Sequence, residues 1–176
     1  LHYGLDLNKV IKLAENFDQI SGRLEQFKLN NKNHAIVDYA HSPDSFKNIL
    51  SCIKEISNKK IITVFGCGGD RDQTKRSIMA SIAEKYSSFV YITNDNPRNE
   101  DPASIRRIIN NYCSNAFNIG NRRLAIKTAI ENLNSKEILI IAGKGHEKKQ
   151  ITKNTIANFD DVKIANYYIK KQNLKR

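Results

Sequence analysis

The chain has 176 residues, of which 40% are hydrophobic and 27% are charged, and its formal net charge is +11. This length and composition indicate a globular domain with a real hydrophobic core. No apolar run approaches the ~20 residues that a membrane-spanning helix needs, so we expect no membrane partner.

The positive charge alone would suit a nucleic-acid partner. However, the chain has 20 Lys and 9 Arg beside 21 Asn and 24 Ile, and the codons of Lys, Asn and Ile are all rich in A and T. A biased genome therefore explains the charge without selection for nucleic-acid binding, and we expect no nucleic-acid partner.

The three cysteines, Cys52, Cys67 and Cys113, lack the spacing of a zinc site or a disulfide framework. This pattern favours a reducing compartment, so the predicted location is cytoplasmic. Cys52 falls on a predicted helix and Cys113 at the end of another, and both are expected to be buried. Cys67 lies in a glycine-rich loop, where it could be reactive or could serve packing.

The first predicted element is a helix over residues 6–18, with Asp6 as N-cap and an apolar stripe that includes Leu7, Ile11, Leu13 and Phe17. A polar loop is predicted at 30–33, and a domain boundary there separates residues 1–33 from a main domain, 34–176. Strands are then predicted at 35–39, 61–65, 89–93, 117–119 and 138–141. Helices are predicted at 42–56, 75–87, 101–112, 121–133 and 160–172.

In the main domain, strands and helices alternate, and the strands are short continuous apolar runs. This pattern is typical of parallel strands that are buried on both faces. We therefore predict an α/β fold, a Rossmann-like, doubly wound, mostly parallel sheet with helices on both faces. Such sheets bind ligands at the carboxyl ends of their strands.

Four predicted strand-to-helix loops are rich in charge or glycine: residues 38–44, 66–72, 95–98 and 142–147. The glycines of the second loop would let a ligand approach the backbone, but its Asp residues would repel a pyrophosphate. The P-loop pattern GxxxxGK[ST] occurs nowhere in the chain. A nucleotide-cofactor domain is therefore disfavoured.

Several of these residues also have a purely structural explanation. Arg98 could pair with Glu100, and His41 and His146 could be hydrogen-bonding residues of the scaffold. A different functional alternative is that Lys144 binds a phosphate, although the adjoining Glu147 favours a ligand of mixed charge. One His and one Glu make a poor metal site, and we predict no metal site in this chain.

Together, the loops bring four charged residues to one edge of the sheet: Arg71, Asp95, Arg98 and Glu147. Arg suits bidentate binding of a carboxylate, and Asp and Glu suit an ammonium group. The predicted ligand is therefore an amino acid.

In this order the loops resemble those of the C-terminal domain of the Mur ligase family. The resemblance rests on six stretches that span nearly the whole chain: Gly22–Glu25, Val37–His41, Phe65–Asp72, Asp95–Arg98, Ala142–Glu147 and Phe159–Asp161. One departure is Ser77, where the family commonly has Pro at a position that opens a helix.

The resemblance implies an ATP-dependent ligase of cytoplasmic peptidoglycan synthesis, from the branch that adds meso-diaminopimelate to UDP-MurNAc-L-Ala-D-Glu. In this family ATP phosphorylates the D-glutamate side-chain carboxylate, the amine of diaminopimelate attacks the acyl phosphate, and ADP and phosphate leave. The implied cofactors are ATP and magnesium, bound mainly by a central domain.

By motif match, the resemblance assigns meso-diaminopimelate binding to Arg71, Asp95, Asn96, Pro97, Arg98, Gly143 and Glu147. Arg98 is expected to hold the carboxylate that lysine lacks, which gives specificity because lysine would leave this charge unpaired. Arg23 and Asp38 match positions that contact ATP, and His41 and His146 are candidates for proton transfer.

The family's P-loop, magnesium ligands and modified lysine lie in a central domain, and its uridine-nucleotide pocket lies in an N-terminal domain. The chain starts at Leu1, and its only Met is Met79. The expectation is that the natural start is missing, that residues 1–33 are the end of the central ATPase domain and a linker, and that residues 34–176 form the C-terminal amino-acid-binding domain. These 176 residues are then expected to fold but not to catalyse alone.

Two alternatives stay open. A lysine-adding Mur ligase is one, and Arg98 argues against it. A non-catalytic, basic, nucleic-acid-binding α/β domain is the other, and the chain lacks the clustered aromatic and Arg residues that stack on bases.

Overall fold

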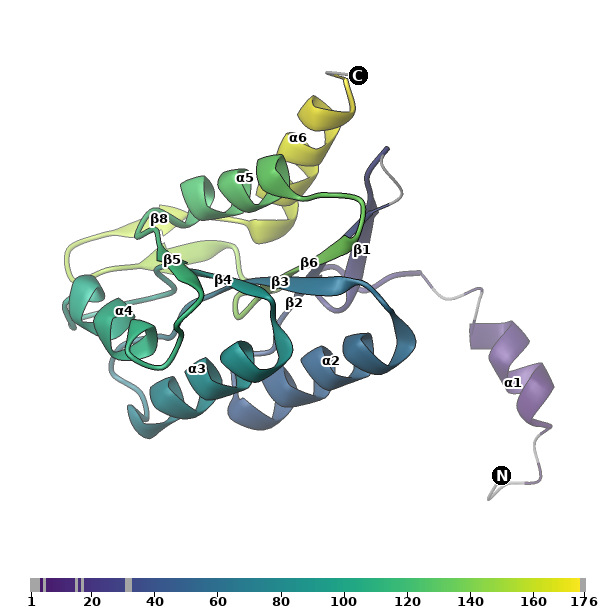
Figure 1. The fold of residues 1–176 in the computed structure, drawn as a ribbon, viewed down its shortest axis with the longest axis horizontal. Helices are drawn as coiled ribbons and strands as arrows, with labels where there is room; N and C mark the ends of the chain where they lie inside the picture. The colour runs from purple at the N-terminus through teal and green to yellow at the C-terminus, as the bar shows by residue number, and fades with distance from the viewer. Residues whose placement is uncertain (1–3, 5, 15, 17, 31–32, 175–176) are drawn as a thin grey trace.

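The main sheet has six strands, and its order differs from the order of the chain. The computed structural model describes residues 4, 6–14, 16, 18–30 and 33–174. Across the sheet the order is β1 (Glu25–Lys28), β2 (His34–Asp38), β6 (Glu137–Ala142), β3 (Lys60–Phe65), β4 (Phe89–Ile92) and β5 (Ala116–Asn118). The neighbouring strands β2, β6, β3, β4 and β5 all pair in parallel, whereas β1 pairs antiparallel with β2 (Figure 1).

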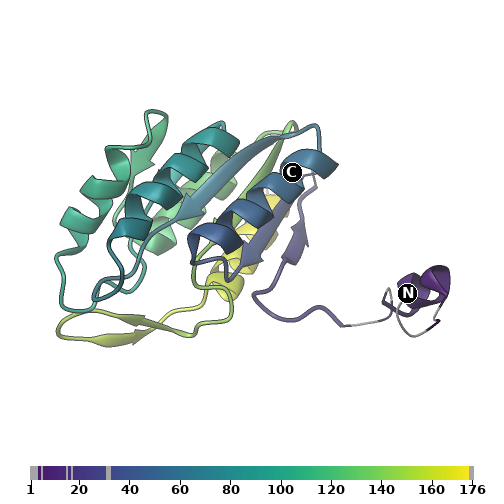
Figure 2. The ribbon, with the colours of Figure 1, turned by 90° about the horizontal axis from the view of Figure 1, so that it is seen from below.

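Helices cover both faces of the sheet. On one face lie α2 (Pro43–Ile56), α3 (Thr74–Tyr86) and α4 (Pro102–Asn110), side by side in Figure 2. On the other lie α5 (Arg122–Asn132) and α6 (Asp161–Asn173). The predicted doubly wound, mostly parallel α/β fold is confirmed.

Each face has its own hydrophobic core. Phe46 of α2 and Met79 of α3 belong to the core on the first face, and Ile126 of α5 and Ile164 of α6 to the core on the second. Full burial of such a side chain stabilises the fold by about 1.5–3 kcal/mol. The two cores therefore hold the helices firmly against both faces of the sheet. The strand ends, where the loops begin, are fixed as a result.

Local sequence signals set the helix starts that the site needs. Ser42 and Ser45 form a reciprocal cap at the start of α2, with Pro43 in the first turn. Asp101 caps α4 before Pro102, and Asp160 caps α6. Each cap is worth about 1 kcal/mol. The three caps stand at the first residues of the predicted helices 42–56, 101–112 and 160–172.

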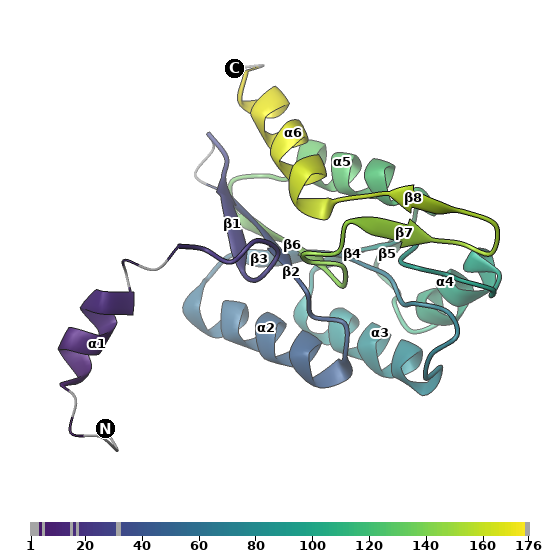
Figure 3. The same ribbon diagram turned by 180° about the vertical axis from the view of Figure 1, so that it is seen from behind.

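Three strands of the structure were not predicted from the sequence: β1, β7 and β8. β1 is amphipathic and only four residues long: Phe27 packs against a core while its neighbours are exposed, and Leu29 just beyond is 5% exposed. The sheet thus begins before residue 34. The hairpin of β7 (Lys149–Ile151) and β8 (Ile156–Asn158) is visible in Figure 3, and its three-residue polar strands give no apolar run to detect.

The first helix, α1 (Leu7–Ala14), lies apart from the sheet (Figures 1 and 3). The predicted apolar stripe faces solvent here, because Leu7, Ile11 and Leu13 are each at least half exposed. Phe17, the last residue of that stripe, lies outside the described residues. No helix in the described part of the chain has the length and apolar character to cross a membrane.

The cysteines differ in burial. Cys52 was expected to be buried but is exposed, because the buried face of α2 is formed by Phe46, Ile49, Leu50 and Ile53. Cys113 is buried, and its Sγ donates to the Ala80 carbonyl oxygen at 3.3 Å. Cys67 is buried too.

Candidate functional site

The four charged loops meet because the strands that carry them are neighbours. In the sheet, β2, β6, β3 and β4 lie next to one another, and they run parallel, so their carboxyl ends share one edge. A cleft of about 490 Å³ opens there. Six of the residues predicted to bind the amino acid line it: Arg71, Asp95, Asn96, Arg98, Gly143 and Glu147.

A buried lysine, Lys144, lies beneath the acidic side of the cleft. Its Nζ donates to Asn96 Oδ1 at 2.8 Å and to Glu147 Oε2 at 3.2 Å, and lies 4.0 Å from Asp95 Oδ1. The Lys144 side chain is fully buried, whereas those of Asp95 and Glu147 are 13% and 33% exposed. Lys144 therefore offsets part of the acidic charge from below and leaves the carboxylates accessible from the cleft.

Asn96 connects the loop after β4 to the loop after β6. Its Oδ1 also accepts from the Ile151 N–H at 3.0 Å, and its Nδ2 donates to Glu147 Oε2 at 2.9 Å. The side chain is 4% exposed, so most of its hydrogen-bonding capacity is used inside the protein. Asn96 lines the cleft, and its hydrogen bond to Glu147 helps to hold that carboxylate in place.

The two predicted carboxylate-binding arginines have no acidic partner in the described part of the chain. No ion pair among the described residues includes Arg71 or Arg98. Arg98 Nη1 donates to the backbone oxygens of Gly69 at 2.8 Å and Asn96 at 3.3 Å. Its backbone is left-handed, with φ of +51°. Such strain in a residue other than glycine is often found at functional sites.

Glu100 does not pair with Arg98, so that simpler explanation of the motif is wrong. The Arg76 Nη2 donates to both oxygens of Glu100, at 2.8 and 2.9 Å, and Arg76 is 1% exposed. Glu100 Oε1 also accepts from the Asp70 N–H at 2.7 Å. The hydrogen bond from Arg76 is the main cause that holds the Glu100 pKa below its usual value.

Gly143 makes room for the acidic side of the cleft. Its φ is +113°, and a Cβ there would lie 3.0 Å from Asp95 Oδ2. A side chain at this position would therefore be strained and would push against the Asp95 carboxylate. This is the structural reason for the glycine in the predicted site.

The residues predicted to contact ATP lie at the end of β2. Asp38 accepts from the Leu24 N–H and the Ala40 N–H, both at 2.8 Å, one with each carboxylate oxygen. The Arg23 guanidinium is exposed and lies 4.4 Å from the centre of the Tyr39 ring. Asp38 thus fixes the loop that presents Arg23.

The two candidate proton-transfer residues flank the same tyrosine. The His41 and His146 rings lie 4.4 and 4.6 Å from the Tyr39 ring, and both histidines are exposed. His41 lines the cleft, and its Nδ1 lies 2.9 Å from the Tyr39 carbonyl oxygen. His146 is not among the lining residues.

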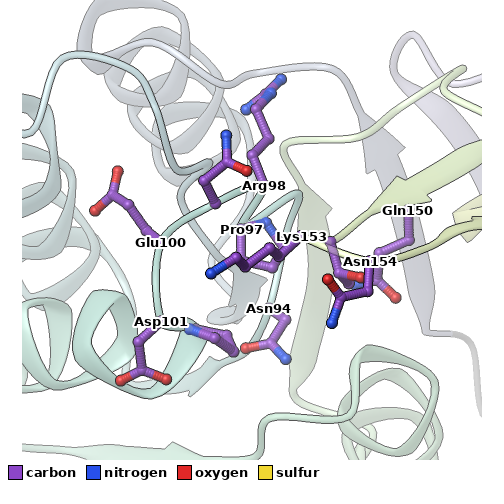
Figure 4. A pocket seen from close by; sticks show the side chains of 11 residues that line it. Asn94, Pro97, Arg98, Glu100, Asp101, Gln150, Lys153 and Asn154 are labelled. Atoms are coloured by element: carbon purple, nitrogen blue, oxygen red, sulfur yellow. The ribbon is translucent and has the colours of Figure 1, made fainter.

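Of the residues predicted to bind the amino acid, Pro97 does not line the cleft. It is buried and lines a second pocket, of about 450 Å³, between the 94–102 loop and the β7–β8 hairpin (Figure 4). Gln150 ties the hairpin to the loop, because its Nε2 donates to the Asp95 carbonyl oxygen at 2.9 Å. Arg98 lines both the pocket and the cleft.

Three buried cations support the loops from behind the cleft, and the sequence did not predict these contacts. They are Arg76, Arg122 and Lys144. The Arg122 guanidinium donates to Asp161 at 2.6 and 2.9 Å and to the Ala142 carbonyl oxygen at 3.0 Å, with both side chains fully buried. In the sequence, Arg122 stands alone in a helical pattern, and such an arginine would be expected on the surface. The only sequence signal for its pairing was the Phe159–Asp161 motif, which contains its partner Asp161.

Cys67 is not a reactive thiol. It is 3% exposed, and burial raises its pKa to about 12, so the thiol stays protonated near neutral pH. Among the residues that the structure describes, no group of three or more His, Cys, Asp or Glu side chains could hold a metal ion.

A known protein family matches most of the chain. The family model described as Mur ligase, glutamate ligase domain, matches residues 22–145. The chain belongs to the Mur ligase family. Membership of this family disfavours the nucleic-acid-binding alternative.

Individual Mur ligases extend the match beyond that segment. The UDP-N-acetylmuramoyl-L-alanyl-D-glutamate–2,6-diaminopimelate ligase of Buchnera aphidicola subsp. Baizongia pistaciae is 46% identical over 177 residues, which cover 98% of this chain and 35% of that protein. A solved structure of a ligase with the same name is 34% identical, with a TM-score of 0.81, over 97% of this chain and 36% of its own. The chain thus spans about a third of the length of these relatives.

A more distant structure shares only the fold. The bifunctional folylpolyglutamate synthase/dihydrofolate synthase of Yersinia pestis, solved with AMPPNP and a Mn ion, is 15% identical, with a TM-score of 0.63. The match covers 97% of this chain and 36% of that structure.

Proposed function

We propose that this chain forms the amino-acid-binding part of an ATP-dependent ligase that adds meso-diaminopimelate to UDP-MurNAc-L-Ala-D-Glu in peptidoglycan synthesis. The observation that carries the proposal is a pair of guanidiniums in the cleft that no carboxylate occupies. Among the described residues, Arg71 and Arg98 have no acidic partner, and they share the cleft with Asp95 and Glu147. The names of the relatives at high identity support the same ligand.

The charges of the cleft match those of the proposed ligand. Diaminopimelate carries two carboxylates and two ammonium groups. The guanidiniums of Arg71 and Arg98 suit carboxylates, since they offer paired N–H donors in one plane. The carboxylates of Asp95 and Glu147 suit an ammonium group. Lysine lacks one carboxylate and would leave one guanidinium unpaired, which makes the lysine-adding alternative a poorer fit.

In the proposed reaction the protein's part is to hold and orient the amino acid. Arg98 is aimed by its bonds to two backbone oxygens, and Glu147 is aimed by Asn96 and Lys144. Held in this way, one amine of the ligand would be presented to the activated acceptor carboxylate. Preorganised contacts of this kind lower the barrier by fixing the reacting groups in position. His41 and His146 remain proposed proton carriers at the Tyr39 end of the site.

The residues of this chain suit only part of ATP. When bound, ATP would supply the phosphoryl group that activates the acceptor carboxylate. Arg23 is exposed on Tyr39, and each Asp38 oxygen accepts one backbone N–H and keeps capacity for another donor. These groups suit the sugar or a charged part of a nucleotide. A P-loop is absent from the 176 residues, and the described residues hold no acidic cluster for magnesium.

The remaining proposals follow because this chain suits the amino acid and only part of ATP. We propose that residues 1–33 lead from a central ATPase domain into this one, with β1 already joined to its sheet, that residues 34–176 form the rest of the C-terminal domain, and that the 176 residues alone do not ligate. A cytoplasmic location is part of the same proposal. Detectable ligation by the isolated chain would contradict the predicted inactivity.

The test is calorimetric titration of the complete ligase with meso-diaminopimelate and with L-lysine. We expect clear preference for meso-diaminopimelate, and Arg98→Ala should reduce that preference by about 10- to 100-fold, the worth of a charge-assisted hydrogen-bond pair. Arg107→Ala, which removes an exposed arginine on α4, is the matched control. Equal affinity for the two amino acids, or undiminished discrimination in Arg98→Ala, would refute the assignment.

A further inference from the structure

Two opposite charges lie on either side of one peptide group beneath the cleft. Arg98 Nη1 donates to the Gly69 carbonyl oxygen at 2.8 Å, and Glu100 Oε1 accepts from the Asp70 N–H at 2.7 Å. That oxygen and that nitrogen belong to the same peptide unit. Given standard peptide dimensions, the guanidinium and the carboxylate are therefore no more than about 8 Å apart. They do not form an ion pair.

A third residue accounts for their separation. Arg76, buried on α3, donates from Nη2 to both Glu100 oxygens and, at 3.4 Å, to the Gly68 carbonyl oxygen. Figure 4 shows the Arg98 and Glu100 side chains leaving their loop in different directions. The Glu100 carboxylate is thus engaged by a cation that does not line the cleft.

We propose that Arg76 is a positioning residue for substrate specificity, because it holds Glu100 away from Arg98. Glu100 is two residues from Arg98 and is 25% exposed, so it can turn toward the cleft when it is released. Once released, it competes with the ligand carboxylate for the Arg98 guanidinium. Arg76 therefore keeps Arg98 available without touching the ligand. This inference rests on the proposed amino-acid site.

The test measures dissociation constants for meso-diaminopimelate and L-lysine in the complete ligase and three variants: Arg76→Met, Glu100→Gln and the double variant. Arg76→Met should weaken meso-diaminopimelate binding about tenfold or more while L-lysine binding changes little, because the freed Glu100 occupies Arg98. The double variant removes the competing charge as well. It should recover meso-diaminopimelate binding to within about threefold of the unmodified protein.

The double variant separates positioning from general structural support. If the Arg76–Glu100 pair only braced the fold, removing both charges would leave discrimination as poor as in Arg76→Met, and the inference would be overturned. Unchanged discrimination in Arg76→Met would also overturn it. Thermal unfolding of each variant confirms that the compared proteins are folded.

Glu100→Gln keeps the inference testable if Arg76→Met does not fold, because Gln retains the shape and an acceptor for Arg76. It should discriminate as the unmodified protein does, and a tenfold loss would show that Glu100 serves the ligand directly. An unmodified ligase that binds both amino acids equally overturns the proposed function together with this inference. A discriminating ligase whose Arg76→Met variant still discriminates overturns the inference alone.

Discussion

Arg122 and Arg98 show how the same side chain serves two regions of this molecule differently. Between α5 and α6, Arg122 is fully buried and is bound by the Asp161 carboxylate and the Ala142 carbonyl oxygen. In the cleft, Arg98 is half-buried and is held by backbone oxygens, with no carboxylate partner among the described residues. A compensated guanidinium supports the fold, whereas an uncompensated one is available to a ligand.

The electrostatics of the Arg122 region show what compensation achieves. Burial opposes the charge on Arg122, but the Asp161 charge and its hydrogen bonds outweigh burial, so the Arg122 pKa is raised above its ordinary value. The Arg122 guanidinium stays charged in the interior. The stability of this buried contact therefore depends on both partners being present.

The largest expected effect comes from breaking the compensated pair. Arg122→Met should lower the free energy of unfolding by about 3–5 kcal/mol, because Asp161 is left as a buried, unpaired charge. Arg98→Ala is the matched comparison and should lower it by only about 1 kcal/mol, because Arg98 is half-buried and water can replace the donor that its backbone acceptors lose. Urea unfolding of the two variants measures the difference.

A double variant sharpens this comparison. Arg122→Met combined with Asp161→Leu removes both buried charges and should recover a large part of the lost stability. Equal destabilisation by Arg122→Met and Arg98→Ala would mean that compensation does not distinguish the two regions.

Lys144 is an intermediate case, because it is fully buried like Arg122 but lies beneath the cleft. Lys144→Met should cost about 1.5–3 kcal/mol of stability, since the bonds to Asn96 and Glu147 are charge-assisted. Lys149→Met, at an exposed position on β7, should stay within about 0.5 kcal/mol. A thermal unfolding series would contradict the structural role of Lys144 if both variants behaved alike.

The smallest expected effect is a pH dependence that comes from Glu100. Its folded pKa lies below the ordinary value of 4.5, because Arg76 binds the ionised form. The unfolded state therefore binds a proton first as the pH falls. The stability that Glu100 contributes is complete above about pH 4.5 and is lost as the pH falls through the folded pKa.

Melting temperatures between pH 6 and pH 3 check this sign. The difference between the unmodified chain and Glu100→Gln should narrow toward the acid end. A difference that widens with acidification would show that the Glu100 carboxyl is stabilised in its protonated form instead.

Much of the fold could be read from the chain because strong local signals decided it. Continuous apolar runs such as 61–65 identified the buried strands, and Ser42–Pro43 and Asp101–Pro102 marked helix starts. β1 and the β7–β8 hairpin were missed because they are short and polar, and gain their stability from pairing with neighbours. Cys52 was misplaced by a small offset from the buried face of its helix.

The charged residues of the candidate site could also be predicted from the sequence. The sequence identified Arg71, Asp95, Arg98 and Glu147, because charges at strand ends gather at one edge of a parallel sheet. It also determined the α/β class and the Mur ligase family, since composition, apolar periodicity and motif order are properties of the chain itself. These residue types and their order were sufficient to predict a ligand of mixed charge.

Only the tertiary structure decided which charges are already paired. The insertion of β6 between β2 and β3 brings Lys144 to Asn96, and the packing of α3 brings Arg76 to Glu100. Such partners are far apart in the sequence, and charge pairing acts over a few ångströms of space. The availability of Arg98 is therefore a property of the folded arrangement, whereas its presence at a strand end is a property of the sequence.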